Sequence, residues 1–528
     1  MIAVSGKQKR SRKTESSAKS PIQGEELSIL LDANVARMKK RFCEANDFVI
    51  REFELHCFDK RRAALFFIDG LVSLAAINES VLRPLMFESR TLADGKKVLI
   101  SIDELTNLLL TAGDVKTADS IDDAVSACLA GDTVLMVDGL NEFAYVSTKG
   151  YEKRSVSEPQ TETVVRGPRE GFTEVLRVNT SLLRRRLKTP DLRLELMQLG
   201  CRTNTAVCLA YIDGIASPQL VAELRKRLNT IDTDAILNSG YIEEFIEDAP
   251  NSLFQTVNFS EKPDVVASKL LEGRCALIID GTPFVLTMPM LFVECFQSPE
   301  DYAARPYIAA FLRIIRVVAF FLSLVSPAMY IALTLYHQEL IPTKLSFTIA
   351  ASSEGVPFNS VIETAIMLAT FEILKEAGVR LPKPIGQAIS IVGALVMGQA
   401  VIQAGIAGAP VVIVVAFTAV AGFLVPNLSD SISILRWYLL ILAAVMGGFG
   451  ITIGLMTILI HLASVESFGS VYLYPFSPFY PDGLKDAVFR APLWKMRMRP
   501  EALKPADKVR QNMKRPHFGG NGGEDAEG

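Results

Sequence analysis

Two carboxylates, Glu363 and Glu372, lie within a short and otherwise largely apolar segment, residues 361–374. A carboxylate is costly in lipid and persists there when it faces a water-filled path or a partner. The chemistry expected of this pair is therefore the attraction of cations at the mouth of a pore rather than covalent catalysis. Both a full membrane crossing and an interfacial or re-entrant helix remain open for this segment, and the second fits its length better.

A stripe of small or polar residues follows the helix expected from 385 to 408. Its members recur every three or four residues and so share one helical face: Gln387, Ser390, Ala394, Gly398, Val401, Gly405 and Gly408. Such a stripe could line a conducting path, with Val401 as an apolar constriction. It could equally provide close packing against another helix, because small residues are selected for both roles. Gln399 and Gln403 lie on roughly the opposite side of this helix.

The sequence offers little support for catalysis or for the binding of a nucleotide or a metal ion. It contains no phosphate-binding G-x-x-x-x-G-K-[ST] loop, no H-E-x-x-H pair and no G-x-G-x-x-G following an expected strand. The four histidines are scattered over the chain, and Asp232-Thr233-Asp234 lacks further ligands at a defined spacing. The sequence therefore predicts no enzyme, and no catalytic residue, cofactor or metal site.

The elements that would position these residues are membrane helices. Apolar residues make up 49% of the chain, and its long charge-free stretches all follow residue 316. Val317 to Tyr336 supplies one crossing of roughly 20 residues. Pro384 to Ser429 is long enough for two crossings, with a break at Ala407-Gly408-Ala409-Pro410, and Trp437 to Val465 supplies another.

Basic residues flank this region at both ends. Arg313 and Arg316 precede the first span, and ten Lys or Arg residues against three acids lie between Lys485 and Arg515. Positive charge marks the cytoplasmic side, so both termini are expected in the cytoplasm, with four crossings as the simplest count. The net charge of −3 gives no reason to expect a nucleic-acid partner.

The region before the membrane helices contains an internal repeat. Phe67 to Ser73 recurs as Tyr211 to Ser217, at an offset of 144 residues. Leu129-x-Gly131 with Asp138-Gly139 returns as Leu271-x-Gly273 with Asp280-Gly281, at an offset of 142: two related α/β lobes are expected. Asp-Gly pairs suit left-handed turns, so the four such pairs are interpreted as turns, with a hairpin joining 134–137 to 143–146.

These observations predict an α/β two-lobed, duplicated N-terminal soluble region plus an all-α polytopic transmembrane domain. The run Arg184-Arg185-Arg186-Leu187-Lys188, between the lobes, either contacts acidic lipid headgroups or a neighbouring subunit, or is a solvated helix face. The expected parts are a disordered basic arm (1–44), lobe 1 (45–150), a basic connector (151–189), lobe 2 (190–300), the transmembrane helical domain (301–480) and a basic cytoplasmic tail (481–528).

Several motifs occur in a specific order along the chain: Arg166 to Phe172 with Asn179 and Arg184-Arg185-Arg186, Leu271 to Gly273 with Asp280 to Pro283, Glu300 to Tyr302, Glu354 to Phe358, Glu376 to Pro382 with Ile385 to Gln387, and Pro475 to Pro478. This series resembles the A-subunit family of bacterial spore-germination receptors, the GerA family, from about residue 45 to 510. Ser252 to Gln255 departs from it, because family members commonly have Ser-Pro-Phe-Pro there. The likeness does not separate a nutrient-receptor A subunit from its sporulation-operon paralogue.

The resemblance implies a protein of the spore's inner membrane that acts with a transporter-like B subunit and a lipoprotein C subunit. It also implies a homo-oligomeric, nutrient-gated cation channel in contact with membrane lipid. The alternative from another class is a non-conducting scaffold or signalling subunit of the same complex. A secondary transporter would show inverted repeats among its membrane segments, and the sequence of this region shows no such symmetry.

Overall fold

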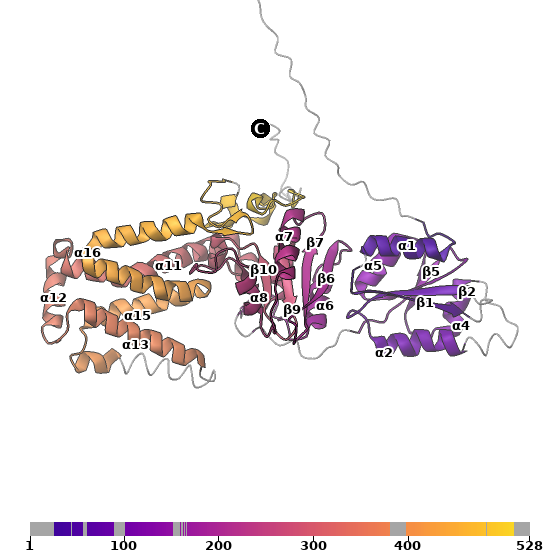
Figure 1. Ribbon diagram of the computed structural model, residues 1–528, viewed down its shortest axis with the longest axis horizontal. Coiled ribbons are helices and arrows are strands. Elements are labelled where there is room, and N and C mark those ends of the chain that lie inside the picture. Colours follow the sequence, from indigo (N-terminus) through magenta and orange to yellow (C-terminus); the bar gives the residue numbers. More distant parts are fainter. Residues whose placement is uncertain are drawn as a thin grey trace, which may run out of the picture. The chain divides into compact units, whose positions relative to one another are not determined.

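The computed structural model describes residues 26–43, 45–55, 61–88, 101–150, 166–380, 398–481 and 483–511, with single residues 159, 162 and 164. The chain divides into two compact units. One comprises residues 1–153 with 188–190, and the other comprises residues 154–187 with 191–528 (Figure 1).

The first unit is built on a five-stranded antiparallel sheet of order β1-β2-β4-β5-β3. Alternate residues of β2 enter two cores on opposite faces, Ala63 and Leu65 in one, Ala64 and Phe66 in the other. Figure 1 shows α1 and α5 on one face of this sheet, and α2 and α4 on the other. The elements are α1 (Leu31–Phe42), β1 (Phe48–Leu55), β2 (Arg61–Ile68), α2 (Leu74–Ile77), π-helical turns at Asn78–Leu82 and Pro84–Glu88, α4 (Ile102–Leu109), β3 (Val115–Ala118), α5 (Ile121–Ala130), β4 (Thr133–Val137) and β5 (Phe143–Val146).

The second unit begins with a sheet of the same kind. Its order, β6-β7-β9-β10-β8, repeats that of the first sheet strand for strand. Helices α6 and α9 cover one face, and α7 and α8 cover the other. Its elements are α6 (Leu176–Arg186), β6 (Leu192–Leu199), β7 (Thr205–Ile212), α7 (Pro218–Asn229), α8 (Ser239–Ile246), β8 (Asn258–Ser260), α9 (Pro263–Leu271), β9 (Cys275–Ile279) and β10 (Val285–Met288). The duplication predicted from the sequence is confirmed by this shared topology.

The Asp-Gly pairs at 138–139 and 280–281 play the same structural role in the two lobes. Asp138 Oδ1 accepts a hydrogen bond of 2.9 Å from the backbone N–H of Leu31, the first residue of α1. Asp280 Oδ1 accepts an equivalent bond of 2.9 Å from Leu176, the first residue of α6. The following glycines both have positive φ, 84° at 139 and 89° at 281, which confirms the turn interpretation. Each lobe therefore uses a hairpin carboxylate to hold the start of its first helix.

Two of the expected domain boundaries are wrong, because each boundary cuts off a helix that belongs to the lobe following it. Residues 31–42, assigned to a disordered arm, form α1, and residues 176–186, assigned to a connector, form α6. Each helix packs on its own sheet and is fixed by an aspartate more than 100 residues away. The arginine run also has a structural role, because Arg185 and Arg186 pair with Glu170 at 3.3 and 2.9 Å.

The rest of the second unit is mostly helical. α11 packs along both α15 and α16, and α13 contacts α15. Among the described residues, Pro306–Leu335 and the stretch Pro426–Ser464 have the length and apolar composition of a bilayer crossing, and Ala409–Gly422 is shorter. The helix of the second stretch is broken at Gly447, where φ is +60° and ψ is −138°. Its two arms pack on each other, because a Cβ at Gly454 would lie 2.9 Å from Leu442, a residue that would be about 18 Å away along one straight helix. The expectation of one continuous crossing from Trp437 to Val465 is therefore wrong. The expected break before Pro410 is confirmed, because α15 begins at Ala409. The elements are 3₁₀ turns at Phe292–Phe296, Gln338–Leu340 and Pro426–Leu428, and α10 (Glu300–Ala303), α11 (Pro306–Leu335), α12 (Thr343–Ser353), α13 (Ser360–Arg380), α15 (Ala409–Phe423) and α16 (Ser429–Ser464).

The segment after α16 folds back onto the second lobe. Its elements are β11 (Glu466–Ser467), β12 (Ser470–Val471) and 3₁₀ turns at Gly483–Asp486, Leu493–Lys495 and Glu501–Leu503. Arg499 Nε donates to the carbonyl of Leu271 at 2.8 Å, and the N–H of Ala506 donates to the carbonyl of Ile215 at 3.0 Å. A Cβ at Gly273 would lie 3.2 Å from Pro505, so this glycine permits the close approach.

Candidate functional site

Glu363 lies near the start of α13 and is 2% exposed. Its Oε1 accepts a hydrogen bond from the backbone N–H of Gly408, the residue that precedes α15. A carboxylate is stabilised there, because the first N–H groups of a helix lack partners within it and carry positive partial charge. In the isolated chain Glu363 therefore caps α15.

Glu372 lies about two and a half turns further along α13 and connects three helices. Its Oε1 accepts from Arg436 Nη1 at 3.1 Å, and its Oε2 accepts from Ser433 Oγ at 3.2 Å. Arg436, on α16, is 3% exposed and also donates from Nε to the carbonyl of Ser323 on α11, at 3.0 Å. Lys375 Nζ lies 3.9 Å from Glu372 Oε2. Both predicted carboxylates thus have partners within their own chain.

The predicted stripe is only partly visible. Gln387, Ser390 and Ala394 lie outside the described residues. Residues 398–403 are helical, and the chain then turns at Gly405, where φ is +63°, so the helix ends before the predicted residue 408. A Cβ at Gly398 would contact Val412 of α15 at 3.7 Å, and Val401 packs against the helical core. The described part of the stripe faces its own chain, whereas Gln399 and Gln403 are exposed.

A buried ionic cluster joins the start of α11 to the segment after α16. Asp301 and Arg313 both have fully buried side chains and pair at 2.8 Å, and Arg316 adds two bonds to Asp301 at 2.8 and 2.9 Å. Arg313 Nη1 also donates to Asp486 at 2.8 Å. Burial alone would raise the pKa of Asp301, but the hydrogen bonds from Arg316 and Arg313 outweigh it and hold that pKa below its usual value.

Sequence reasoning interpreted Arg313 and Arg316 as topology markers and did not find this cluster. A signal was present, because arginines three residues apart lie on one side of a helix. Asp301 also lies in the Glu300-Asp301-Tyr302 motif on which the family resemblance partly rested. What the sequence could not supply was Asp486, which is 173 residues from Arg313.

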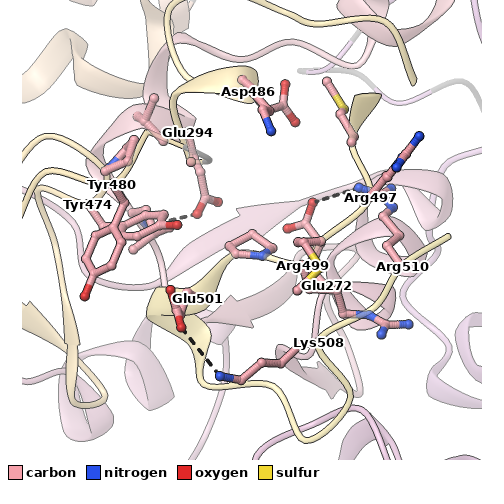
Figure 2. Close-up of a pocket in the computed structure, with 18 of the residues that line it drawn as sticks. Glu272, Glu294, Tyr474, Tyr480, Asp486, Arg497, Arg499, Glu501, Lys508 and Arg510 are labelled. Carbon is pink, nitrogen blue, oxygen red and sulfur yellow. Dashed lines mark hydrogen bonds and ion pairs between the residues drawn. The ribbon is translucent and has the colours of Figure 1, made fainter. Parts of the chain in front are cut away.

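A pocket of about 410 Å³ lies between the second lobe and the segment after α16. Figure 2 shows Glu272 of the lobe beside Arg510, whose Nη1 lies 4.0 Å from it, and Glu294 beside Tyr474 and Tyr480. Buried Arg274 pairs with Glu294 at 2.6 Å, and Lys269 pairs with Glu294 at 2.5 Å. Burial alone would raise the pKa of Glu294, but Arg274 and Lys269 outweigh it, so that pKa lies below its usual value. The pocket was not predicted, because its walls come from distant parts of the chain.

The candidates for other chemistry are dispersed. Asp232 Oδ1 accepts a bond from the Cys201 thiol at 3.5 Å, and His461 Nε2 lies 2.9 Å from Ser252 Oγ. His56 and His517 lie outside the described residues. Within the described residues, no group of three or more His, Cys, Asp and Glu side chains is placed to hold a metal ion.

Comparison with known proteins gives a consistent result. The family model described as Bacillus/Clostridium GerA spore germination protein matches residues 36–502. Spore germination protein KA of Bacillus subtilis (strain 168) is 46% identical over 487 residues, 92% of this chain and 89% of that protein. The membrane protein YfkQ of the same organism is 43% identical, over 86% of this chain and 88% of that one. Spore germination protein GerLA of Bacillus cereus is 38% identical, over 88% and 93%.

Among solved structures, the chain is similar to the N-terminal domain of the A subunit of the Bacillus megaterium spore germinant receptor GerK3. The two are 35% identical in sequence, with a TM-score of 0.40. The match covers 51% of this chain and 98% of that domain.

Proposed function

Because this chain belongs to the GerA family of spore germination proteins, we propose that it is the A subunit of a germinant receptor and forms an oligomeric, nutrient-gated cation channel that helps to trigger germination. The observation that carries the proposal is the extent of the family match, residues 36–502, which includes both lobes and the long apolar helices. A receptor A subunit acts with a transporter-like B subunit and a lipoprotein C subunit, and these are the partners proposed here.

The proposed location is the inner membrane of the spore, with four crossings and both termini on the cytoplasmic side. Support for a membrane domain comes from the long apolar helix α11, the two apolar arms of α16 and the shorter apolar helix α15. Arg313, Arg316 and the basic segment after α16 meet at one end of α11, as expected of a cytoplasmic boundary. Labelling of a cysteine introduced at Lys495 tests this topology, and modification from the outer face would overturn it.

The proposed conducting path places Gln387, Ser390, Ala394, Gly398, Val401 and Gly405 on the pore wall, with Glu363 and Glu372 favouring cations. Gln399 and Gln403 are exposed on the helix spanning 398–403, so a neighbouring subunit or a water-filled path can reach their polar side chains. Carboxylates in an apolar region support cation rather than anion passage.

One observation favours the alternative of a non-conducting scaffold. Glu363 and Glu372 are both engaged within the chain, the first by Gly408 and the second by Arg436. Charges compensated in this way serve helix packing without any ion flow. A channel requires that assembly of the subunits breaks the contacts of Glu363 and Glu372 with Gly408 and Arg436, whereas a scaffold keeps them.

Ionic current separates the two functions. The receptor, assembled with its B and C subunits, is reconstituted in planar bilayers and exposed to single amino acids, sugars and nucleosides in turn. A channel gives a cation-selective current with an effective nutrient, and Glu372→Gln reduces the preference for cations. Glu466→Gln is the matched control, because Glu466 is exposed in β11 of the segment after α16. Correctly assembled complexes that bind nutrient but pass no current would establish the scaffold.

Val401→Ala tests the pore wall specifically. If Val401 forms an apolar constriction, loss of two methyl groups widens it and raises the current at rest. Gln399→Leu and Gln403→Leu test the opposite side of the same helix. A change of conductance confined to the glutamine variants would assign the path to that side and refute the stripe.

A further inference from the structure

The pocket in Figure 2 contains two cationic side chains whose charges are not compensated within the described part of the chain. Lys495 and Arg497 line the pocket and are exposed, and neither has an ion pair or side-chain hydrogen bond with a described residue. The neighbouring cations differ in this respect. Arg499 pairs with Asp507 at 2.8 Å, and Lys508 approaches Glu501 at 3.5 Å.

The inner wall of the pocket is fixed and electrostatically balanced. Arg274 is 2% exposed and lies between Glu294, at 2.6 Å, and Glu272, at 3.3 Å. The carbonyl of Pro289 also accepts from Arg274 Nη1. A buried charge with such partners is costly to displace, so Glu294 stays on the inner wall. Glu272 also lies 4.0 Å from Arg510, and in the described part of the chain neither acid pairs with Lys495 or Arg497. Across the lining, seven basic residues face four acids, so the pocket is positive overall.

The shape and charge of the pocket select a class of ligand. A volume of about 410 Å³ is within the usual range of roughly 300 to 1,000 Å³ for small-molecule sites. A guanidinium binds phosphate through two parallel hydrogen bonds, and a lysine adds a mobile point charge. We propose that this pocket is a binding site for a phosphate-bearing anion, held by Arg497 and Lys495 above the Arg274–Glu294 pair. This site is separate from the proposed conducting path and does not depend on it.

Two sources could supply such a phosphate: a soluble metabolite or an anionic lipid headgroup. The same segment carries exposed aromatic residues, Phe479, Phe489 and Trp494, of which Trp494 directly precedes Lys495. Aromatic residues beside Lys and Arg are typical of the membrane interface. The segment also follows directly on α16, whose two apolar arms belong to the membrane-type helices. The shared chemistry is a phosphate monoester or diester with net negative charge.

The test is calorimetric titration of the detergent-solubilised full chain with three probes. These are dioctanoyl phosphatidylglycerol, dioctanoyl phosphatidylcholine and sn-glycerol 3-phosphate. We expect saturable binding of at least one of the two anionic probes and at least tenfold weaker binding in Lys495→Gln/Arg497→Gln, because each charged hydrogen bond to phosphate contributes about tenfold. The control is Arg202→Gln/Lys226→Gln, which removes two exposed cations of the second lobe outside the pocket lining.

Binding of glycerol 3-phosphate supports the site with a soluble source, and binding of phosphatidylglycerol alone supports it with a headgroup source. Lys495→Arg should retain the affinity in either case, since it keeps the charge. Equal affinity for phosphatidylcholine, no binding of either anionic probe, or equal weakening in the control variant would each overturn the proposal. If Lys495→Gln/Arg497→Gln loses binding of the anionic probes but the assembled receptor still passes normal current, the phosphate site is supported as separate from the proposed channel.

Discussion

Replacement of Asp301 by asparagine removes the charge at the centre of the buried ionic cluster. Asp301 accepts one hydrogen bond from Arg313 and two from Arg316, all between 2.8 and 2.9 Å, and its side chain is fully buried. Asparagine has nearly the same shape, so the substitution leaves packing intact. It leaves Arg313 buried with Asp486 as its remaining anionic partner.

The loss in the free energy of unfolding depends on Asp486, which still pairs with Arg313. Breaking a buried pair by removing one member typically costs about 3 to 5 kcal/mol. Because Asp486 still compensates part of the charge on Arg313, we expect the lower end, about 3 kcal/mol. The second unit has about 370 residues. At about 2.1 cal/mol/K of unfolding entropy per residue, this loss lowers the midpoint of thermal unfolding by roughly 4 °C.

The assay is the fraction of monodisperse full chain that survives heating in detergent, followed by size-exclusion chromatography. Glu466→Gln is the control, because it removes an exposed carboxylate and should shift the midpoint by less than about 2 °C. The pKa of Asp301 lies below its usual value, so its contribution is complete above about pH 4 and is lost as pH falls through the pKa of the folded state. The deficit of Asp301→Asn should thus be constant from pH 5 to 8. A midpoint within about 2 °C of the parent would show that the cluster does not hold this junction.

Three further substitutions test other features. Asp280→Ala removes the cap of α6 and should cost about 0.5 to 2 kcal/mol in chemical unfolding of the full chain, with Ser recovering part of it; no loss would mean that the cap is dispensable. Gly447→Ala should lower detergent stability by about 1 to 3 kcal/mol, because φ there is +60° and a Cβ would lie 2.9 Å from that of Tyr336; a stable variant would refute this strain. Gly398→Leu should reduce conductance in assembled receptors while Gly398→Ala, whose methyl group fits at 3.7 Å from Val412, does not; loss of assembly instead would identify a packing residue.

The sequence predicted those features that depend on local composition or on repetition. Charge-free stretches located α11 and α16, and the repeated Asp-Gly pairs predicted two related α/β lobes. Gly408 and Pro410, two residues apart, were enough to predict the break that precedes α15. In each case the information lies within a window of a few residues or in the comparison of two such windows.

Features that depend on distant partners were missed. The charged run at 184–186 predicted a connector, because nothing nearby shows that Asp280 caps α6 or that Glu170 pairs with Arg186. The basic pocket was missed for the same reason, since Arg274 and Arg497 are far apart in the sequence. Glu363 and Glu372 were identified as functional candidates, but their partners Gly408 and Arg436 were not.

The return of the chain after α16 has a mechanical consequence. The second lobe contacts the membrane-type helices and this returning segment at several points. The carbonyl of Phe296 accepts a hydrogen bond from Arg316 of α11, the carbonyl of Leu253 accepts from Ser431 at the start of α16, and the carbonyl of Leu271 accepts from Arg499 beyond the end of α16. A body held at three separate points cannot rotate freely about any one of them. A displacement of the lobe would therefore move α11 and α16 together, and loss of the Arg499 contact would leave the lobe coupled to both helices through the other two.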